Sequence, residues 1–87
     1  MAGGSVTTEE IFQKIRQILA EKLKMKEEQI SKDSHLVDDI GVDSVDFWEI
    51  IAKVEQEFEI DVADDEVKGV NTVQDIVDVL KDKLEVS

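Results

Sequence analysis

The chain has 87 residues, of which 41% are hydrophobic and 37% charged, with a formal net charge of −12 and no cysteine. This composition supplies one small hydrophobic core and argues against global disorder, and the lack of cysteine excludes disulfides and thiolate-bound metal as supports. No hydrophobic run reaches the roughly 18 residues of a membrane span, and no signal peptide opens the sequence. We therefore expect a cytoplasmic protein, with an organelle form whose targeting segment has been removed as the alternative.

Helical spacing of apolar residues predicts a first helix over residues 8–24, after a flexible segment at residues 1–6. Thr7 and Glu10 form a candidate capping box at the start of this helix. The connection that follows, residues 25–43, is long for a small domain, which indicates that it packs against the core or has a function.

A short helical turn is expected at residues 64–68, with Gly69 as its stop signal. The last helix is predicted over residues 72–84 and begins with a second capping pair, Thr72 and Asp75. Together with a helix over residues 44–57, these segments predict an all-α fold. We expect a small antiparallel four-helix bundle, with three longer helices, one short helix and a long first loop.

The negative charge is concentrated in the middle of the chain. Residues 38–66 hold twelve acidic residues and one basic residue, Lys53, whereas residues 1–37 are neutral and residues 67–87 carry a net charge of −1. Many acidic proteins have such a stretch merely as a solvated face. Because nearly all the charge lies in one block, we expect a directed field that attracts basic protein partners and repels nucleic acid and anionic membranes.

The most informative stretch lies at the start of the helix expected over residues 44–57. Its sequence is Asp38-Asp39-Ile40-Gly41-Val42-Asp43-Ser44-Val45-Asp46, which places a hydroxyl between two acids, directly after a glycine-containing turn. Taken alone, Ser44 or Asp43 would be interpreted as an ordinary helix N-cap.

This stretch resembles the prosthetic-group attachment region of acyl carrier proteins, whose Asp-Ser-Leu motif stands here as Asp43-Ser44-Val45. The resemblance covers residues 8–84, and includes Val54-Glu55-Gln56-Glu57-Phe58 and Asn71-Thr72-Val73-Gln74-Asp75 in family-like order and spacing. It implies that residues 7–87 form an acyl carrier domain. It also implies that Ser44 carries 4′-phosphopantetheine, attached covalently from coenzyme A, and that this arm holds acyl intermediates as thioesters for fatty-acid biosynthesis.

Parts of this pattern also fit other functions. A carrier for polyketide or other lipid synthesis remains an alternative, as does an acidic helical interaction module that never carries an arm. A hydrolase is disfavoured because the only histidine, His35, lies in the expected loop and no G-x-S-x-G pattern surrounds Ser44. The stretches that begin at Asp33 and Asp61 lack the ligand spacing of a calcium-binding EF-hand. We therefore expect no enzymatic activity and no specific metal site.

The helix that begins at Ser44 has an outward face on which Ser44, Trp48 and Ala52 follow at intervals of four residues. The resemblance implies that this face binds phosphopantetheinyl transferase and acyl-processing enzymes through their basic surfaces, with the carrier as a monomer. The expected partner-binding residues are Asp43, Asp46, Trp48, Glu49, Ala52 and Glu55. For Trp48, a place in the core is the alternative to an exposed interface anchor.

The opposite face of this helix is expected to point into the bundle. By the family's register, an acyl chain would be sheltered there by aliphatic side chains, although a filled core needs the same residue types. These residues are Leu36, Val37, Ile40, Val54, Val62, Val67, Val70, Ile76 and Val79. Phe47 belongs to the same expected pocket, but many family members have a smaller or polar residue at this position. Two interpretations of Phe47 are open, ordinary core packing against the first helix and a bulky residue that narrows the pocket mouth.

Overall fold

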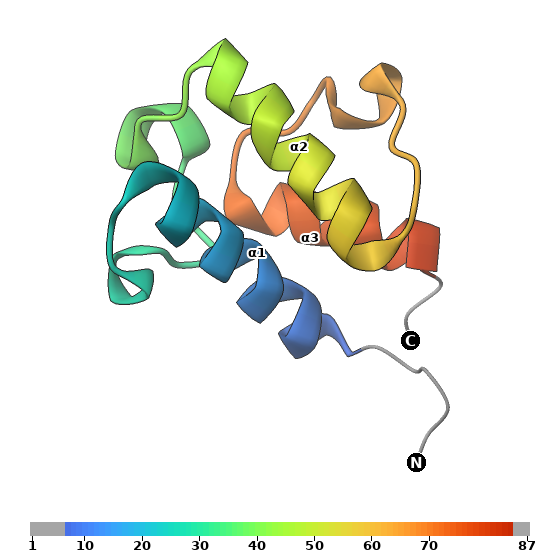
Figure 1. Ribbon diagram of the computed structural model, residues 1–87, viewed down its shortest axis with the longest axis horizontal. Coiled ribbons are helices and arrows are strands. Elements are labelled where there is room, and N and C mark those ends of the chain that lie inside the picture. The colour runs from blue at the N-terminus through green and yellow to red at the C-terminus, as the bar shows by residue number, and fades with distance from the viewer. Residues whose placement is uncertain (1–6, 85–87) are drawn as a thin grey trace.

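The structure is a computed structural model that describes residues 7–84, and it consists of helices joined by loops (Figure 1). The segment predicted to be flexible, residues 1–6, lies outside the described residues. The three long helices are α1 (Thr8–Leu23), α2 (Ser44–Phe58) and α3 (Val73–Leu84). Single helical turns lie in the connections and are η1 (Glu27–Gln29), η2 (Leu36–Ile40) and η3 (Asp64–Val67). The predicted all-α bundle is confirmed, and no β-strand occurs within residues 7–84.

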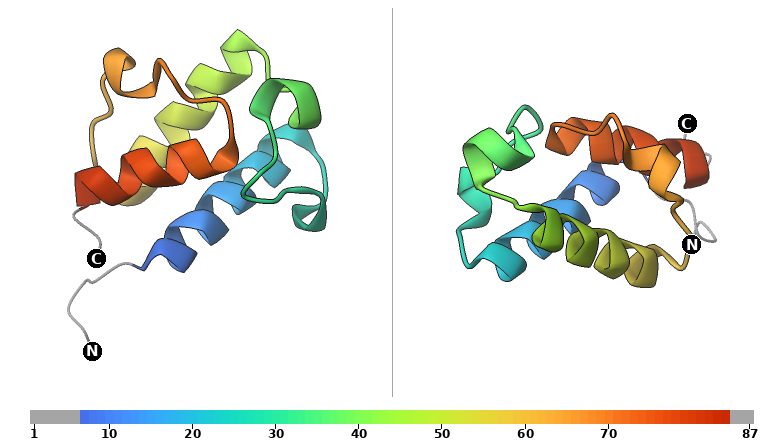
Figure 2. Two further views of the ribbon diagram at one scale, coloured as in Figure 1. Left: turned by 180° about the vertical axis from the view of Figure 1, so that it is seen from behind. Right: turned by 90° about the horizontal axis from the view of Figure 1, so that it is seen from above.

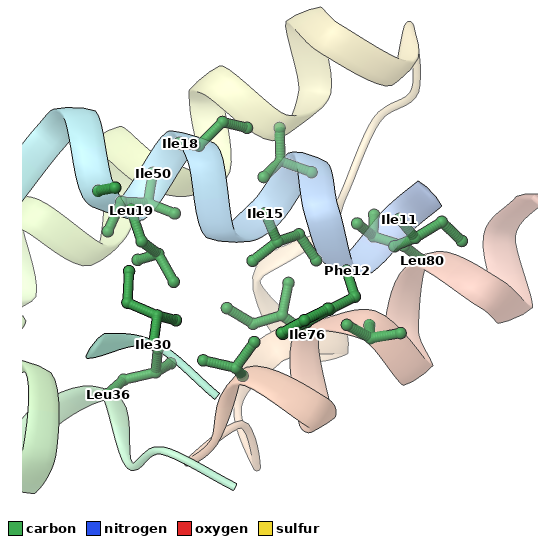
Figure 3. Close-up of a cluster of buried hydrophobic side chains, with 14 of the residues drawn as sticks. Ile11, Phe12, Ile15, Ile18, Leu19, Ile30, Leu36, Ile50, Ile76 and Leu80 are labelled. Atoms are coloured by element: carbon green, nitrogen blue, oxygen red, sulfur yellow. The ribbon is translucent and has the colours of Figure 1, made fainter. Parts of the chain in front are cut away.

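Helix α1 packs against both α2 and α3, and it runs in the direction opposite to theirs (Figures 1 and 2). The side chains of Ile11, Ile15 and Leu19 on α1 are fully buried (Figure 3). They belong to the same core as Val54 of α2 and Leu80 of α3. Their spacing of four residues keeps them on one face of the helix, so burial of that face holds the three helices together.

The predicted capping box at the start of α1 is confirmed. Thr7 Oγ1 accepts a hydrogen bond from the backbone N–H of Glu10 at 3.1 Å, and Glu10 Oε1 accepts one from the N–H of Thr7 at 3.0 Å. At the other end, Lys24 adopts a left-handed conformation with φ 56° and donates its N–H to the carbonyl of Ala20. The helix therefore ends at Leu23, one residue earlier than expected.

The second predicted capping pair is also confirmed. Asp75 Oδ2 accepts the N–H groups of Asn71 at 2.8 Å and Thr72 at 3.0 Å, while Thr72 Oγ1 accepts the N–H of Asp75 at 3.2 Å. Three backbone N–H groups that precede or begin α3 thus have side-chain partners, which stabilises this helix end.

The long connection between α1 and α2 packs against the core instead of lying free, because Ile30, Leu36 and Val42 are buried. It was expected to be a loop, but residues Leu36–Ile40 form a π-type turn in which the N–H of Ile40 donates to the carbonyl of His35 at 3.0 Å. Gly41 then reverses the chain with φ 90°, a conformation that favours glycine. This reversal places α2 directly after the turn.

Backbone pairing joins the same connection to the start of α3. The N–H of Leu36 donates to the carbonyl of Asn71 at 2.8 Å, and the N–H of Val73 donates to the carbonyl of Ser34 at 3.1 Å. Segments that are far apart in the sequence are therefore held side by side, at the end of the bundle where α2 begins.

The short turn η3 differs from its prediction. Residues Asp64–Val67 form a 3₁₀ turn, and Gly69 does not adopt the left-handed conformation expected of a helix stop. The N–H of Val70 donates to the carbonyl of Val67 at 3.2 Å, so the chain continues in a further turn and needs no special glycine conformation there. Among residues 7–84, no helix has the length and apolar character needed to cross a membrane.

Candidate functional site

Asp43 sets where α2 begins. Its backbone is extended, and its Oδ1 atom accepts the N–H of Asp46 at 2.8 Å, while its carbonyl accepts the N–H of Phe47 at 2.9 Å. Asp43 is therefore the N-cap, and Ser44 is the first residue of the helix. Of the two residues that could have capped this helix, Ser44 and Asp43, it is Asp43 that does so.

Ser44 is exposed, and its hydroxyl makes no hydrogen bond to any residue that the structure describes. The N–H groups of Ser44 and Val45 lie in the first turn of α2, where no carbonyl of the helix precedes them. The hydroxyl thus stands at the positive end of a helix with two free backbone donors beside it.

Acidic side chains surround this helix start. Asp38 and Asp39 lie in η2, and Asp43 and Asp46 begin α2. The carboxylate of Asp39 accepts the N–H of His35 at 2.8 Å, and that of Asp43 is used for capping, whereas the carboxylates of Asp38 and Asp46 have no hydrogen-bond donor among residues 7–84. The region around Ser44 is therefore strongly negative.

Exposed hydrophobic side chains gather at the same end of the molecule. Within residues 7–84, the large hydrophobic residues that stand exposed are Val37 (69%), Val45 (64%) and Trp48 (45%). Val37 lies in η2, and Val45 and Trp48 lie in the first turns of α2. Trp48 is thus not a core residue, which removes the alternative interpretation of this side chain.

The sequence matches the family described as "Phosphopantetheine attachment site" over residues 13–80. An acyl carrier protein of Buchnera aphidicola is 41% identical over 73 residues, which are 84% of this chain and 91% of that relative. The acyl carrier protein of Thermotoga maritima is 40% identical over 76 residues, 87% of this chain and 94% of the relative. The acyl carrier protein of Clostridium perfringens is 36% identical over 75 residues, 86% and 99% of the two chains. This chain belongs to the acyl carrier protein family.

In this chain, the outward face of α2 includes the exposed residues Ser44, Trp48 and Ala52, as their spacing predicts. Besides Asp43, which caps α2, two of the acids expected to bind partners have contacts within the fold. The carboxylate of Glu49 forms an ion pair with Lys22 of α1, and this hydrogen-bonded contact raises the pKa of Lys22. Glu55 Oε2 accepts the N–H of Val62 at 2.8 Å, so its carboxylate holds the chain that follows α2.

The residues expected to shelter an acyl chain fall into three classes of exposure. The buried ones are Leu36, Val54, Val67 and Ile76. The half-buried ones are Ile40, Phe47, Val62, Val70 and Val79. Val37 is exposed, because Leu36 takes the inward position of η2, but the side chain of Val37 still borders a cleft near the start of α2.

Two clefts lie near the start of α2. The first has a volume of about 290 Å³ and lies between η2, the start of α2 and residues 70–71. The second has a volume of about 420 Å³ and lies between α2 and residues 64–70. The sequence did not single out Val42 and Asn71, which border the first cleft, or Lys68, which borders the second. Val42 and Asn71 lie within stretches that resemble the family, but nothing in those stretches assigns them to a cleft, since the cleft forms only after distant segments have packed together.

Proposed function

We propose that this protein holds acyl intermediates for fatty-acid biosynthesis on a 4′-phosphopantetheine arm attached to Ser44. The observation that supports this most directly is the Ser44 hydroxyl, which is exposed and makes no hydrogen bond to the described part of the chain, while Asp43 caps the helix. A transferase must reach this oxygen from outside, which the exposure of Ser44 permits.

The residues around Ser44 fit the phosphodiester that would join the arm to the protein. This group keeps a negative charge, and the free N–H groups of Ser44 and Val45 with the positive end of α2 favour such a charge by about 0.3–1 kcal/mol at exposed sites. Asp43 and Asp46 oppose it, but water and salt screen charges at such an exposed position. When bound, the arm supplies a terminal thiol that carries an acyl chain as a thioester.

The protein would act as a carrier and have no catalytic activity of its own. Its partners would be the phosphopantetheinyl transferase and acyl-processing enzymes that approach α2 with basic surfaces. This assignment of α2 as the docking surface is supported by four residues on or beside the outward face of the helix, which are Asp43, Asp46, Trp48 and Ala52. A monomeric state and a cytoplasmic location remain predictions from the sequence.

Modification of the purified protein tests the attachment site. Incubation with a phosphopantetheinyl transferase and coenzyme A should add one phosphopantetheine group, measured by intact mass. The variant Ser44→Ala should gain no mass and should remain folded by circular dichroism, because the Ser44 hydroxyl is exposed and makes no hydrogen bond to residues 7–84. Ser31→Ala is the matched control and should be modified in full, since Ser31 lies outside α2. Modification of Ser44→Ala would overturn the assignment.

A further inference from the structure

The two clefts beside α2 share a wall. Phe47 and Val70 border both of them. The first cleft also reaches Asp43, the residue directly before Ser44, and its apolar surface includes Leu36 and Val42. The second cleft lies beyond the shared wall and is bordered by Trp48, Val67 and Lys68. The first cleft is therefore the one whose lining includes a residue directly adjacent to Ser44 in the chain.

The wall is positioned by packing and not by a covalent or ionic link. The ring of Phe47 packs against the buried core and meets Trp48 edge-on, with ring centroids 5.3 Å apart and planes at 75°. Val70 approaches from the segment before α3 and also packs against the core. Both side chains are half-buried, whereas Val54 and Ile76 behind them are buried in the filled interior. The clefts therefore offer an apolar chain more space than the core does.

We infer that Phe47 and Val70 form a partition that limits how much of an acyl chain this protein can shelter. This inference rests on the proposed attachment of the arm to Ser44. Short acyl chains fill the first cleft, and longer chains reach the partition and leave their remaining methylene groups exposed to water. A smaller residue at position 47 joins the two clefts into one continuous groove, so that a longer chain becomes sheltered along α2.

Melting temperatures of loaded forms measure this limit, because each methylene removed from water stabilises the folded state. Ser44 is loaded with butyryl, octanoyl or palmitoyl groups, and each form is compared with the unacylated holo-protein. In the wild type, the melting temperature should rise with the shorter chains and gain nothing from octanoyl to palmitoyl. In Phe47→Leu, the palmitoyl form should melt about 4 °C or more above the octanoyl form. In Val70→Ala, which shortens the other side chain of the partition, the palmitoyl form should likewise melt above the octanoyl form.

Phe58→Leu is the matched control. Phe58 also lies in α2 and is half-buried against the core, but it borders neither cleft. This variant makes the same chemical change and should keep the wild-type dependence on chain length. An equal palmitoyl gain in Phe58→Leu would overturn the inference, since it would reflect loosened packing in general.

Trp48 provides a second measurement, because it is the only tryptophan of the chain and borders the second cleft. In the wild type, its fluorescence should not shift when octanoyl is replaced by palmitoyl. In Phe47→Leu, the same replacement should shift the emission to shorter wavelength as the chain enters the second cleft. A palmitoyl shift in the wild type, or none in Phe47→Leu, would overturn the partition alone. Failure of the transferase to modify Ser44 would instead overturn the proposed function and, with it, this inference.

Discussion

At the scale of single residues, Asp75 shows how one carboxylate organises a helix start. Hydrogen bonds from the N–H groups of Asn71 and Thr72 hold the pKa of Asp75 below its ordinary value, since they favour its charged form. The same two residues belong to the segment that pairs with the loop at Leu36. The charge of Asp75 therefore supports both the start of α3 and the loop that precedes η2.

Asp75→Asn should reduce stability in a pH-dependent way. A carboxyl group whose pKa is lower in the folded than in the unfolded state stabilises the fold above the unfolded value of about 3.9, and this contribution is lost as the pH falls through the folded value. The variant should be less stable than the wild type at neutral pH, and the difference should shrink below about pH 4. Urea unfolding of both proteins, from neutral pH to below about pH 4, measures this difference in the free energy of unfolding. Asp82→Asn, an exposed position on α3, serves as the control. A difference that stays constant with pH would contradict the role of the charge.

At the scale of elements, α2 divides its residues between two tasks. Ile50, Ile51 and Val54 are buried, while Ser44 and Trp48 stand exposed on the other side. Lysines of α1 reach two of its acids, because Lys22 pairs with Glu49 and Lys14 pairs with Glu57 at 3.3 Å. The acids at the N-terminal end of α2, Asp43 and Asp46, form no ion pair within residues 7–84. The acids of α2 that lie closest to Ser44 are therefore not neutralised by an ion pair within the described residues.

Docking to a basic partner should depend on the acids of α2 more than on acids elsewhere. Two triple variants that remove equal charge test this, one with Asp43→Asn, Asp46→Asn and Glu49→Gln, the other with Glu9→Gln, Glu10→Gln and Glu21→Gln. Exposed charge pairs are each worth about 0.2–1 kcal/mol, so the α2 variant should weaken binding of the transferase roughly 3- to 100-fold at low salt. Glu49→Gln alone should have the smallest effect of the three, because Lys22 already pairs with this carboxylate.

Dissociation constants measured by calorimetry at several salt concentrations distinguish a docking face from overall charge. The difference in dissociation constant between the two triple variants should decrease as salt screens the charges. Equal losses in both triple variants would show that overall net charge, and not a docking face, attracts the partner.

At the scale of the whole molecule, residues 38–66 concentrate negative charge in a small fold. These residues carry a net charge of −11, and basic residues from outside this stretch neutralise part of that charge. Lys83 of α3 pairs with Glu66 of η3 at 2.7 Å, and this contact lowers the pKa of Glu66. Together with Lys14 and Lys22 of α1, it places positive charge from α1 and α3 against the acidic residues 38–66. Most of the acids in the block remain unmatched, so they repel one another in the compact state.

Millimolar magnesium chloride or moderate sodium chloride should therefore raise the melting temperature. Relief of about 1 kcal/mol corresponds to a rise of roughly 4–8 °C for a domain of this size. Calorimetry in low-salt buffer, with the two salts compared at equal ionic strength, separates general screening from a stronger effect of the divalent ion. An unchanged or lower melting temperature would mean that the acids are already compensated within the fold.

The sequence by itself determined the features that depend on neighbours within one helical turn. The starts of α1 and α3 were predicted by two capping pairs, Thr7 with Glu10 and Thr72 with Asp75. The spacing of apolar residues predicted which face of each long helix is buried. These features follow from sequence because each cap joins residues three positions apart, and a helix repeats its faces every few residues. The attachment motif at Ser44 is equally local, since it consists of consecutive residues.

Only the tertiary structure decided what depends on segments brought together from afar. The turn η2 was not predicted because its conformation relies on Gly41 and on backbone pairing with Asn71, which lies more than one element away in the chain. The same packing turned Val37 outward and brought Phe47 and Val70 to the wall between two clefts. It also gave Glu49 a partner in Lys22 of another helix. Such contacts leave no periodic signal in the sequence, since the two sides come from elements whose relative position is set by burial of the common core.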